Sequence, residues 1–335
     1  MLEGGDLDSG RRHVHLFAYT CDLRLVVFDV GFLSSPQYLF FGDQIDDHGP
    51  LPFGRLRPGL KRRHVLRQRN HLVTEAFGFN IMGLQRDQLL EDVGLAAQVQ
   101  RMFLPRHRPS IAGLEIAGMM QPARVVGGDF YGYIPVDAHR MQVVVADVSG
   151  KGVSAALLMS ATAAALQFQS NQGPDVQQTI ARLNSGIHAV SDGEHYVTVV
   201  LAEIDTSARS LRYMNCGHNP ALLLRRKTGQ VETLDSSCPP VGMFEQELCE
   251  LSRLEIDTGD VLVFYTDGLT EAANRLEEEF GLQRLTSIVQ ETSSLSAEEI
   301  MRAISLQTSE FCQDNGFSDD VTILVVKCEF GKSPE

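Results

Sequence analysis

Short strand-like segments, gathered in groups rather than alternating one by one with helices, constrain the fold of this chain most. They are rich in β-branched and aliphatic residues, as strands are. The predicted strands are Leu114–Met119, Met141–Ala146, Tyr196–Ile204, Leu211–Asn215, Ala221–Arg225, Val261–Thr266 and Val321–Lys327. The predicted helices among them are Val153–Gln169, Val176–Ser191, Leu282–Glu291 and Ala297–Gln313. This grouping favours an α+β layered sandwich over a doubly wound parallel sheet.

A further helical pattern, Asp87–Leu104, precedes the sandwich and ends before Pro105. Its apolar residues spread over about half of the helix circumference, which is wider than one coiled-coil seam. They are Leu89, Val93, Leu95, Ala96, Val99, Met102 and Phe103. We expect a linker helix within residues 81–110, followed by a large domain over residues 111–330. Two alternatives stay open for this helix: it packs partly on a second copy and forms a homodimer, or it is a simple core helix.

Residues 1–80 differ from the rest in charge and carry no recognisable motif. Ten Lys and Arg against nine Asp and Glu leave a charge of +1 there. The whole chain has a net charge of −14, so residues 81–335 carry −15. The basic cluster within residues 55–69 has no interleaved aromatic residues, which favours a solvated loop over a nucleic-acid site. Residues 1–80 stay unassigned, either as a small sensory domain or as a partly disordered region.

Charge and hydropathy exclude several classes of partner. The net charge of −14 argues against binding to nucleic acids and anionic membranes. The longest apolar run, Val153–Leu166, is too short to span a bilayer, and Met1–Gly10 lacks the apolar core of a signal peptide. Six scattered cysteines without CxxC spacing indicate neither a disulfide framework nor a zinc site. We therefore expect a cytoplasmic protein without a membrane or nucleic-acid partner.

Acidic residues stand repeatedly where an apolar strand segment begins or ends. They are Asp147, Asp267, Asp319 and Asp320, and a further one, Asp129, follows Gly127 and Gly128, whose missing side chains permit close backbone approach. One Asp beside a strand is usually a turn or cap residue, but several at rigid strand ends suggest a shared site. Carboxylates in one cleft repel each other unless divalent cations neutralise them. Because the ligands are all oxygen, the pattern favours two Mg²⁺ or Mn²⁺ ions over zinc.

Two such ions, about 3.5–4 Å apart, activate a water and hold a phosphoryl group for in-line attack. No protein nucleophile is then needed. The segment Ser149–Gly152 is not a nucleotide-binding loop, because Val145 and Gly152 stand where that motif needs Gly and Ser or Thr. We interpret His218, within Cys216–Pro220, as a hydrogen-bonded turn residue rather than a general acid.

Four segments resemble, in the same order, the signatures of SpoIIE-type bacterial phosphatases of the PPM class. They are Val126–Tyr131, Ala146–Gly152, Tyr265–Ala272 and Asp319–Thr322. The resemblance covers about residues 90–330. It implies a four-layer α-β-β-α sandwich. One departure is Gly132, where many relatives carry an acidic residue that makes an outer contact to the metal site.

The resemblance also implies the roles of the acidic residues. Asp147 bridges the two Mn²⁺ or Mg²⁺ ions, and the backbone carbonyl of Val148 binds one of them. Asp267 and Asp319 complete the other coordination shell, while Asp129 binds directly or through water. Asp319 matches the ligand position of the family, and Asp320 is the alternative.

The activity implied by the resemblance is hydrolysis of phosphoserine or phosphothreonine on a partner protein by a metal-activated water. The implied substrate is an anti-sigma-factor antagonist in a partner-switching pathway. Two alternatives remain: a catalytically silent scaffold that binds phosphoproteins, and a metal-dependent phosphatase of a small metabolite. The first is disfavoured because Asp147, Asp267 and Asp319 are all present.

Overall fold

A computed structural model describes residues 12–19, 25–32, 39–43, 86–170, 175–191, 195–245, 249–313 and 316–331. The chain divides into two units, Met1–Phe79 and Asn80–Glu335. In the first unit the strands form an antiparallel sheet in the order β1-β2-β3. Their bounds are β1 Arg12–Tyr19, β2 Leu25–Phe32 and β3 Leu39–Asp43. The basic cluster within residues 55–69 lies outside the described residues.

Two five-stranded antiparallel sheets build the second unit. The first sheet has the order β10 (Val231–Leu234), β9 (Ala221–Leu224), β12 (Val261–Tyr265), β13 (Val321–Cys328) and β4 (Leu114–Gln121). The second sheet has the order β11 (Ser252–Glu255), β8 (Ser210–Cys216), β7 (Val197–Asp205), β6 (Arg140–Val148) and β5 (Phe130–Pro135). The chain crosses from one sheet to the other several times, so residues far apart in sequence meet at the sheet ends.

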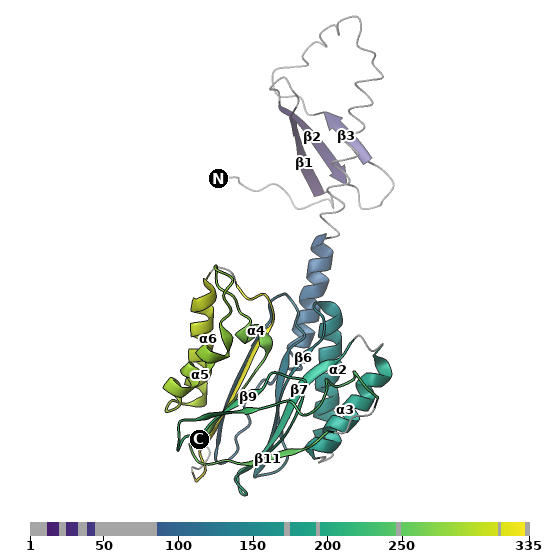
Figure 1. Cartoon of the computed structure of the whole chain (residues 1–335). Helices are drawn as coiled ribbons and strands as arrows, with labels where there is room; N and C mark the ends of the chain where they lie inside the picture. The colour runs from purple at the N-terminus through teal and green to yellow at the C-terminus, as the bar shows by residue number, and fades with distance from the viewer. Residues whose placement is uncertain are drawn as a thin grey trace, which may run out of the picture. The chain divides into compact units, whose positions relative to one another are not determined.

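Helices cover the outer face of each sheet (Figure 1). The second sheet is covered by α2 (Val153–Ser170) and α3 (Val176–Val190). The first is covered by α5 (Gly281–Thr292) and α6 (Ala297–Cys312), and the short α4 (Asp267–Thr270) follows β12. The predicted α-β-β-α sandwich is therefore confirmed.

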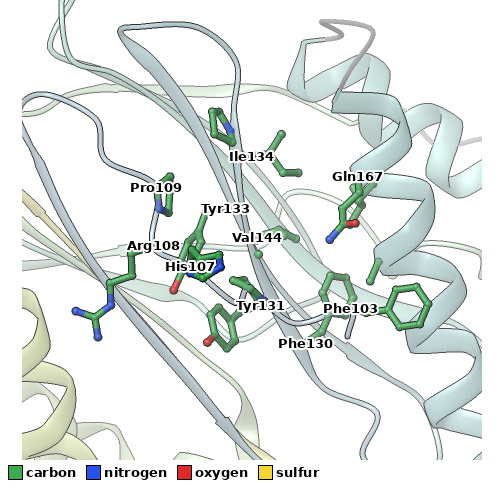
Figure 2. Close-up of a pocket in the computed structure, with 15 residues that line it drawn as sticks. Phe103, His107, Arg108, Pro109, Phe130, Tyr131, Tyr133, Ile134, Val144 and Gln167 are labelled. Atoms are coloured by element: carbon green, nitrogen blue, oxygen red, sulfur yellow. The ribbon is translucent and has the colours of Figure 1, made fainter. Parts of the chain in front are cut away.

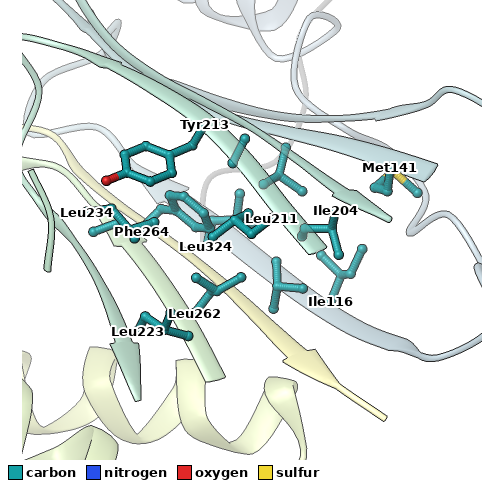
Figure 3. Packing of buried hydrophobic residues seen from close by; sticks show 14 of the residues in the cluster. Ile116, Met141, Ile204, Leu211, Tyr213, Leu223, Leu234, Leu262, Phe264 and Leu324 are labelled. Atoms are coloured by element: carbon teal, nitrogen blue, oxygen red, sulfur yellow. The ribbon is translucent and has the colours of Figure 1, made fainter. Parts of the chain in front are cut away.

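The middle layer of the core consists of side chains from the two facing sheets (Figure 3). Strand β12 shows how the layers share one strand: Leu262 and Phe264 point into the middle layer, whereas Val263 and Tyr265 face α5 and α6. Successive side chains of a strand point to opposite faces. Because both faces of β12 are buried, its sequence is apolar throughout instead of alternating with polar residues.

The structure corrects several of the sequence-based expectations. Strand β6 runs past Asp147 to Val148 instead of ending before the aspartate. The helix spans residues 86–100 and therefore ends before Leu104, because residues 101–103 form tight turns ahead of Pro105. A disulfide joins Cys238 and Cys249, whose Cα atoms are 5.3 Å apart, although their spacing matches no known motif.

None of the helices in the described part of the chain has the length and apolar character needed to cross a membrane.

Candidate metal centre

The predicted acidic residues come together at one end of the two sheets. Asp129 directly precedes β5, Asp147 lies near the end of β6, and Asp267 begins α4, with one residue between it and the end of β12. Asp319 and Asp320 directly precede β13. The Asp147 carboxylate interacts electrostatically with those of Asp267, Asp319 and Asp320, so these residues form one group of interacting charges. The two sheets therefore bring together residues separated by up to 191 positions, from Asp129 to Asp320.

Asp129 is the most enclosed of these carboxylates, with 2% of its surface exposed. Its Oδ2 accepts hydrogen bonds from Thr266 Oγ1 at 2.6 Å and Thr322 Oγ1 at 2.8 Å. Both threonines belong to the first sheet region, whereas Asp129 leads into the second. Burial, and then the charge of Asp147, raise the pKa of Asp129 well above its usual value, against the effect of the two hydroxyls. Asp129 therefore ties the two sheets together at the site.

Asp320 and Asp319 have different surroundings. Asp320 accepts hydrogen bonds from the backbone N–H of Gly128 at 2.6 Å and of Ala123 at 2.8 Å. Its carboxylate is thus occupied in holding the loop before Asp129. Asp319 instead forms an ion pair with Lys151, at 2.5 Å between Oδ2 and Nζ. This difference supports Asp319 over Asp320 as the residue available to a metal ion.

Two glycines allow these segments to approach each other. A side chain at Gly128 would place its Cβ 3.1 Å from the Val148 carbonyl oxygen and 3.3 Å from Ala155 Cβ. A side chain at Gly268 would collide with the backbone carbonyl of Asp320. Glycine is used where backbones must come this close. The glycines beside Asp129 and Asp267 therefore have a packing reason.

Asp147 and Asp267 carry raised pKa values because they share this enclosed region. Burial, followed by the charge of Asp267, raises the pKa of Asp147 to about 7. Burial, followed by the charge of Asp319, raises the pKa of Asp267. Crowded carboxylates of this kind are relieved by a divalent cation. The donor set, which is carboxylate and carbonyl oxygen, fits Mg²⁺ or Mn²⁺.

Side chains would have to move before an ion could bind. Among the described residues, no three Asp, Glu, His or Cys side chains are gathered closely enough to hold a metal as they stand. Lys151 occupies Asp319, and the Val148 carbonyl lies beside the Gly128 turn. A small hollow next to these acids is lined by Arg124 and Lys151 together with Asp319 and Asp320. The positively charged side chains of Arg124 and Lys151 therefore flank the carboxylates.

Sequence reasoning missed the residues that hold the acids in place. Thr266, Thr322 and Lys151 stand within the signature segments, but only the tertiary fold shows that they contact the aspartates. Arg124 lies outside those segments and lines the hollow beside Asp319 and Asp320. His218 does act as a hydrogen-bonded turn residue, as predicted: it is 3% exposed and its backbone N–H donates to Asn215 Oδ1 at 2.9 Å. Burial lowers the pKa of His218 to about 4.

A cavity of about 260 Å³ lies along β5, and none of its lining residues is one of these aspartates (Figure 2). Its walls are mainly aromatic, proline and aliphatic side chains from the segment after the helix over residues 86–100, from β5 and from α2. Gly132 lines this cavity, and a Cβ there would meet only Val144, at 3.1 Å. A Cβ at position 132 would thus have no acidic side chain within 4 Å.

Known proteins are similar to this chain in sequence and in fold. A family model described as Stage II sporulation protein E (SpoIIE) matches residues 137–329. Protein IcfG of Synechocystis sp. is 30% identical over 68% of this chain, which spans only 40% of IcfG. Phosphoserine phosphatase RsbU of Bacillus subtilis is 26% identical over 74% of this chain and 72% of its own length. The SiaA-PP2C domain structure of Pseudomonas aeruginosa has a TM-score of 0.63 at 19% identity and covers 73% of this chain and 98% of its own.

Proposed function

The chain belongs to the SpoIIE family, and we propose that it is a metal-dependent phosphatase that removes phosphate from phosphoserine or phosphothreonine on a partner protein. The observation that carries this proposal is the convergence of Asp129, Asp147, Asp267 and Asp319 at one end of the two sheets. The similarity to a phosphoserine phosphatase over most of both chains supports the same reaction.

Two Mn²⁺ or Mg²⁺ ions would be held by Asp129, Asp147, Asp267, Asp319 and the Val148 carbonyl. Bound there, such ions lower the pKa of a water and neutralise charge on the phosphoryl group. Asp129 keeps its position through Thr266 and Thr322. Asp320 keeps the Gly128 turn in place through two backbone N–H groups. These contacts hold the ligands rigid, which the geometry of phosphoryl transfer requires.

Arg124 and Lys151 are proposed to bind and orient the substrate phosphate. Both line the hollow beside Asp319 and Asp320, and the charge of Arg124 acts on Lys151. Cations placed beside a phosphoryl group stabilise the charge on its oxygens. When a metal ion binds the Asp319 carboxylate, the Lys151 ammonium would leave that carboxylate and bind the substrate phosphate instead.

The proposed substrate is a phosphorylated anti-sigma-factor antagonist of a partner-switching pathway in the cytoplasm. We further propose that residues 111–330 form the phosphatase domain, with a linker helix within residues 81–110 and a sensory region in residues 1–80. Homodimerisation through the linker helix belongs to the same proposal.

The test is phosphate release by the full chain with Mn²⁺ from three substrates: p-nitrophenyl phosphate, a phosphoserine-bearing antagonist protein and a panel of small phosphorylated metabolites. The proposal expects the protein to be the preferred substrate by kcat/KM. Turnover of metabolites alone would indicate a metabolite phosphatase. Tight binding of the phosphoprotein without turnover would indicate a scaffold.

A further inference from the structure

His218 lies in the turn between β8 and β9, where the chain passes from the second sheet to the first. The turn itself is fixed by hydrogen bonds. Asn215 Oδ1 accepts from the His218 backbone N–H at 2.9 Å, and Asn215 Nδ2 donates to the Leu234 carbonyl at 3.0 Å. The imidazole therefore has a defined position and orientation inside the protein.

Both ring nitrogens of His218 have partners, and each partner belongs to a different sheet. Nε2 lies 3.1 Å from the backbone carbonyl oxygen of Tyr265 in β12. A carbonyl can only accept, so Nε2 carries the ring proton. Nδ1 is then the acceptor for the hydroxyl of Thr198 in β7, at 2.8 Å. One neutral imidazole thus bridges the two sheets.

The two bridged strands carry the acidic residues. Thr198 pairs with Asp147 in the ladder between β6 and β7, and its Oγ1 also lies 3.3 Å from the Asp147 carbonyl oxygen. Tyr265 ends β12, two positions before Asp267. Asp147 and Asp267 reach the site from different sheets, and each sheet is packed against its own helices. Their separation therefore depends on contacts that cross between the sheets.

We propose that His218 is a positioning residue: by joining Thr198 to the Tyr265 carbonyl it sets the spacing between Asp147 and Asp267, and thereby the affinity for divalent cations. This proposal rests on the proposed metal-dependent function. Groups that orient metal ligands without touching the metal commonly change metal affinity or activity by about 10–100-fold when they are removed.

Thr198→Val tests the proposal, because valine keeps the shape of threonine and replaces the hydroxyl with a methyl group, which removes the contacts of Oγ1 to His218 and to the Asp147 carbonyl. Isothermal titration of Mn²⁺ into the metal-stripped full chain should show binding weakened by about tenfold. The kcat for p-nitrophenyl phosphate should fall more than KM rises. Thr198→Ser, which keeps the hydroxyl, should have the wild-type kcat and the wild-type affinity for Mn²⁺. His218→Leu should weaken Mn²⁺ binding at least as much, and adding Thr198→Val to it should cause little further loss, because both changes remove the same bond.

Thr308→Val is the matched control. Thr308 is a fully buried threonine in α6, and its hydroxyl donates to the Ile304 carbonyl of the same helix at 2.8 Å, so it does not join the two sheets. It should lower the melting temperature without changing Mn²⁺ affinity. Equal Mn²⁺ affinities for Thr198→Val and Thr308→Val would overturn the proposal. If the wild-type chain binds Mn²⁺ but hydrolyses no substrate, the proposed function fails while this comparison still decides the role of His218.

Discussion

Single aspartates at the site differ in what their carboxylates already bind. Asp129 and Asp320 accept hydrogen bonds from hydroxyl and backbone N–H groups of the fold. Asp319 contacts only the more exposed Lys151 side chain and its neighbouring backbone. The same residue type therefore serves structure at one position and is available to ligands at the next.

Replacing the two neighbouring acids should separate these roles. Asp320→Asn should destabilise the protein by about 1–3 kcal/mol. The amide has a single oxygen, so it cannot accept both of the backbone N–H bonds that the two carboxylate oxygens accept. Asp319→Asn should leave stability nearly unchanged but weaken Mn²⁺ binding. Urea unfolding in EDTA and Mn²⁺ titration of both variants measure the two effects. The reverse assignment of stability and affinity would show that Asp320 is the ligand.

That the aspartates lie together was predictable from sequence, because four of them stand beside an apolar strand segment and Asp129 follows two glycines. Their partners were not predictable. Thr266 and Thr322 are separated by 56 positions, and only the pairing of β12 with β13 brings both to Asp129. Contacts of this kind follow from strand register, which a single sequence does not specify.

Among the secondary structure elements, the helix over residues 86–100 divides its apolar residues between two environments. Ala97 is buried against Val126 and Ala156, and Val93 packs beside them. Leu95 and Val99, by contrast, expose more than half of their surfaces, at 55% and 56%. The predicted wide apolar arc is thus only partly covered by the helix's own domain.

Val99→Asp tests whether a second copy covers the exposed part. If the helix forms the proposed homodimer, the charge should shift the mass measured by light scattering from dimer to monomer and change phosphatase activity. Gln98→Asp adds the same charge at the neighbouring exposed position and should change neither value. An unchanged mass and unchanged kinetics in folded Val99→Asp protein would argue against dimerisation through this helix.

In the second unit, the elements that were not predicted from the sequence are the short or irregular ones; no element was predicted in residues 1–80, where β1, β2 and β3 lie. Strand β5 contains Gly132 and ends at Pro135, and both residue types are uncommon in strands. Strand β11 has only four residues and a half-exposed pattern, and α4 has only four residues. Such elements exist because neighbouring strands and loops hold them, so local propensity gives little signal. The long strands were predicted because burial on both faces makes them continuously apolar.

For the molecule as a whole, collecting carboxylates at one end of the sandwich should make the metal-free protein sensitive to pH. The pKa of Asp147 is raised from 3.8 to about 7. Between these values the folded state holds a proton that the unfolded state releases, so stability falls as pH rises from about 4 to about 7. Urea unfolding in EDTA at pH 5 and pH 7.5 should show this loss, and Asp147→Asn should reduce it. An equal pH dependence in both proteins would contradict the assignment.

Removal of metal should silence the whole protein. EDTA should abolish phosphate release, Mn²⁺ or Mg²⁺ should restore it, and Zn²⁺ should substitute poorly because the proposed ligands are all oxygen. Mn²⁺ should also raise the melting temperature, since a ligand that binds the folded state stabilises it. Full activity in EDTA, with negligible metal content confirmed by elemental analysis, would rule out metal dependence.

The most direct test of the two-metal account is phosphate release from the phosphoserine-bearing antagonist by Asp147→Asn, assayed with saturating Mn²⁺ beside the wild type. Asp147 is the proposed bridging ligand, and an amide supplies neither the charge nor the two donor oxygens that the ions need. The account predicts a folded variant, with a cooperative melting transition, that has lost nearly all turnover and most Mn²⁺ binding. Near-wild-type turnover by that variant would contradict it.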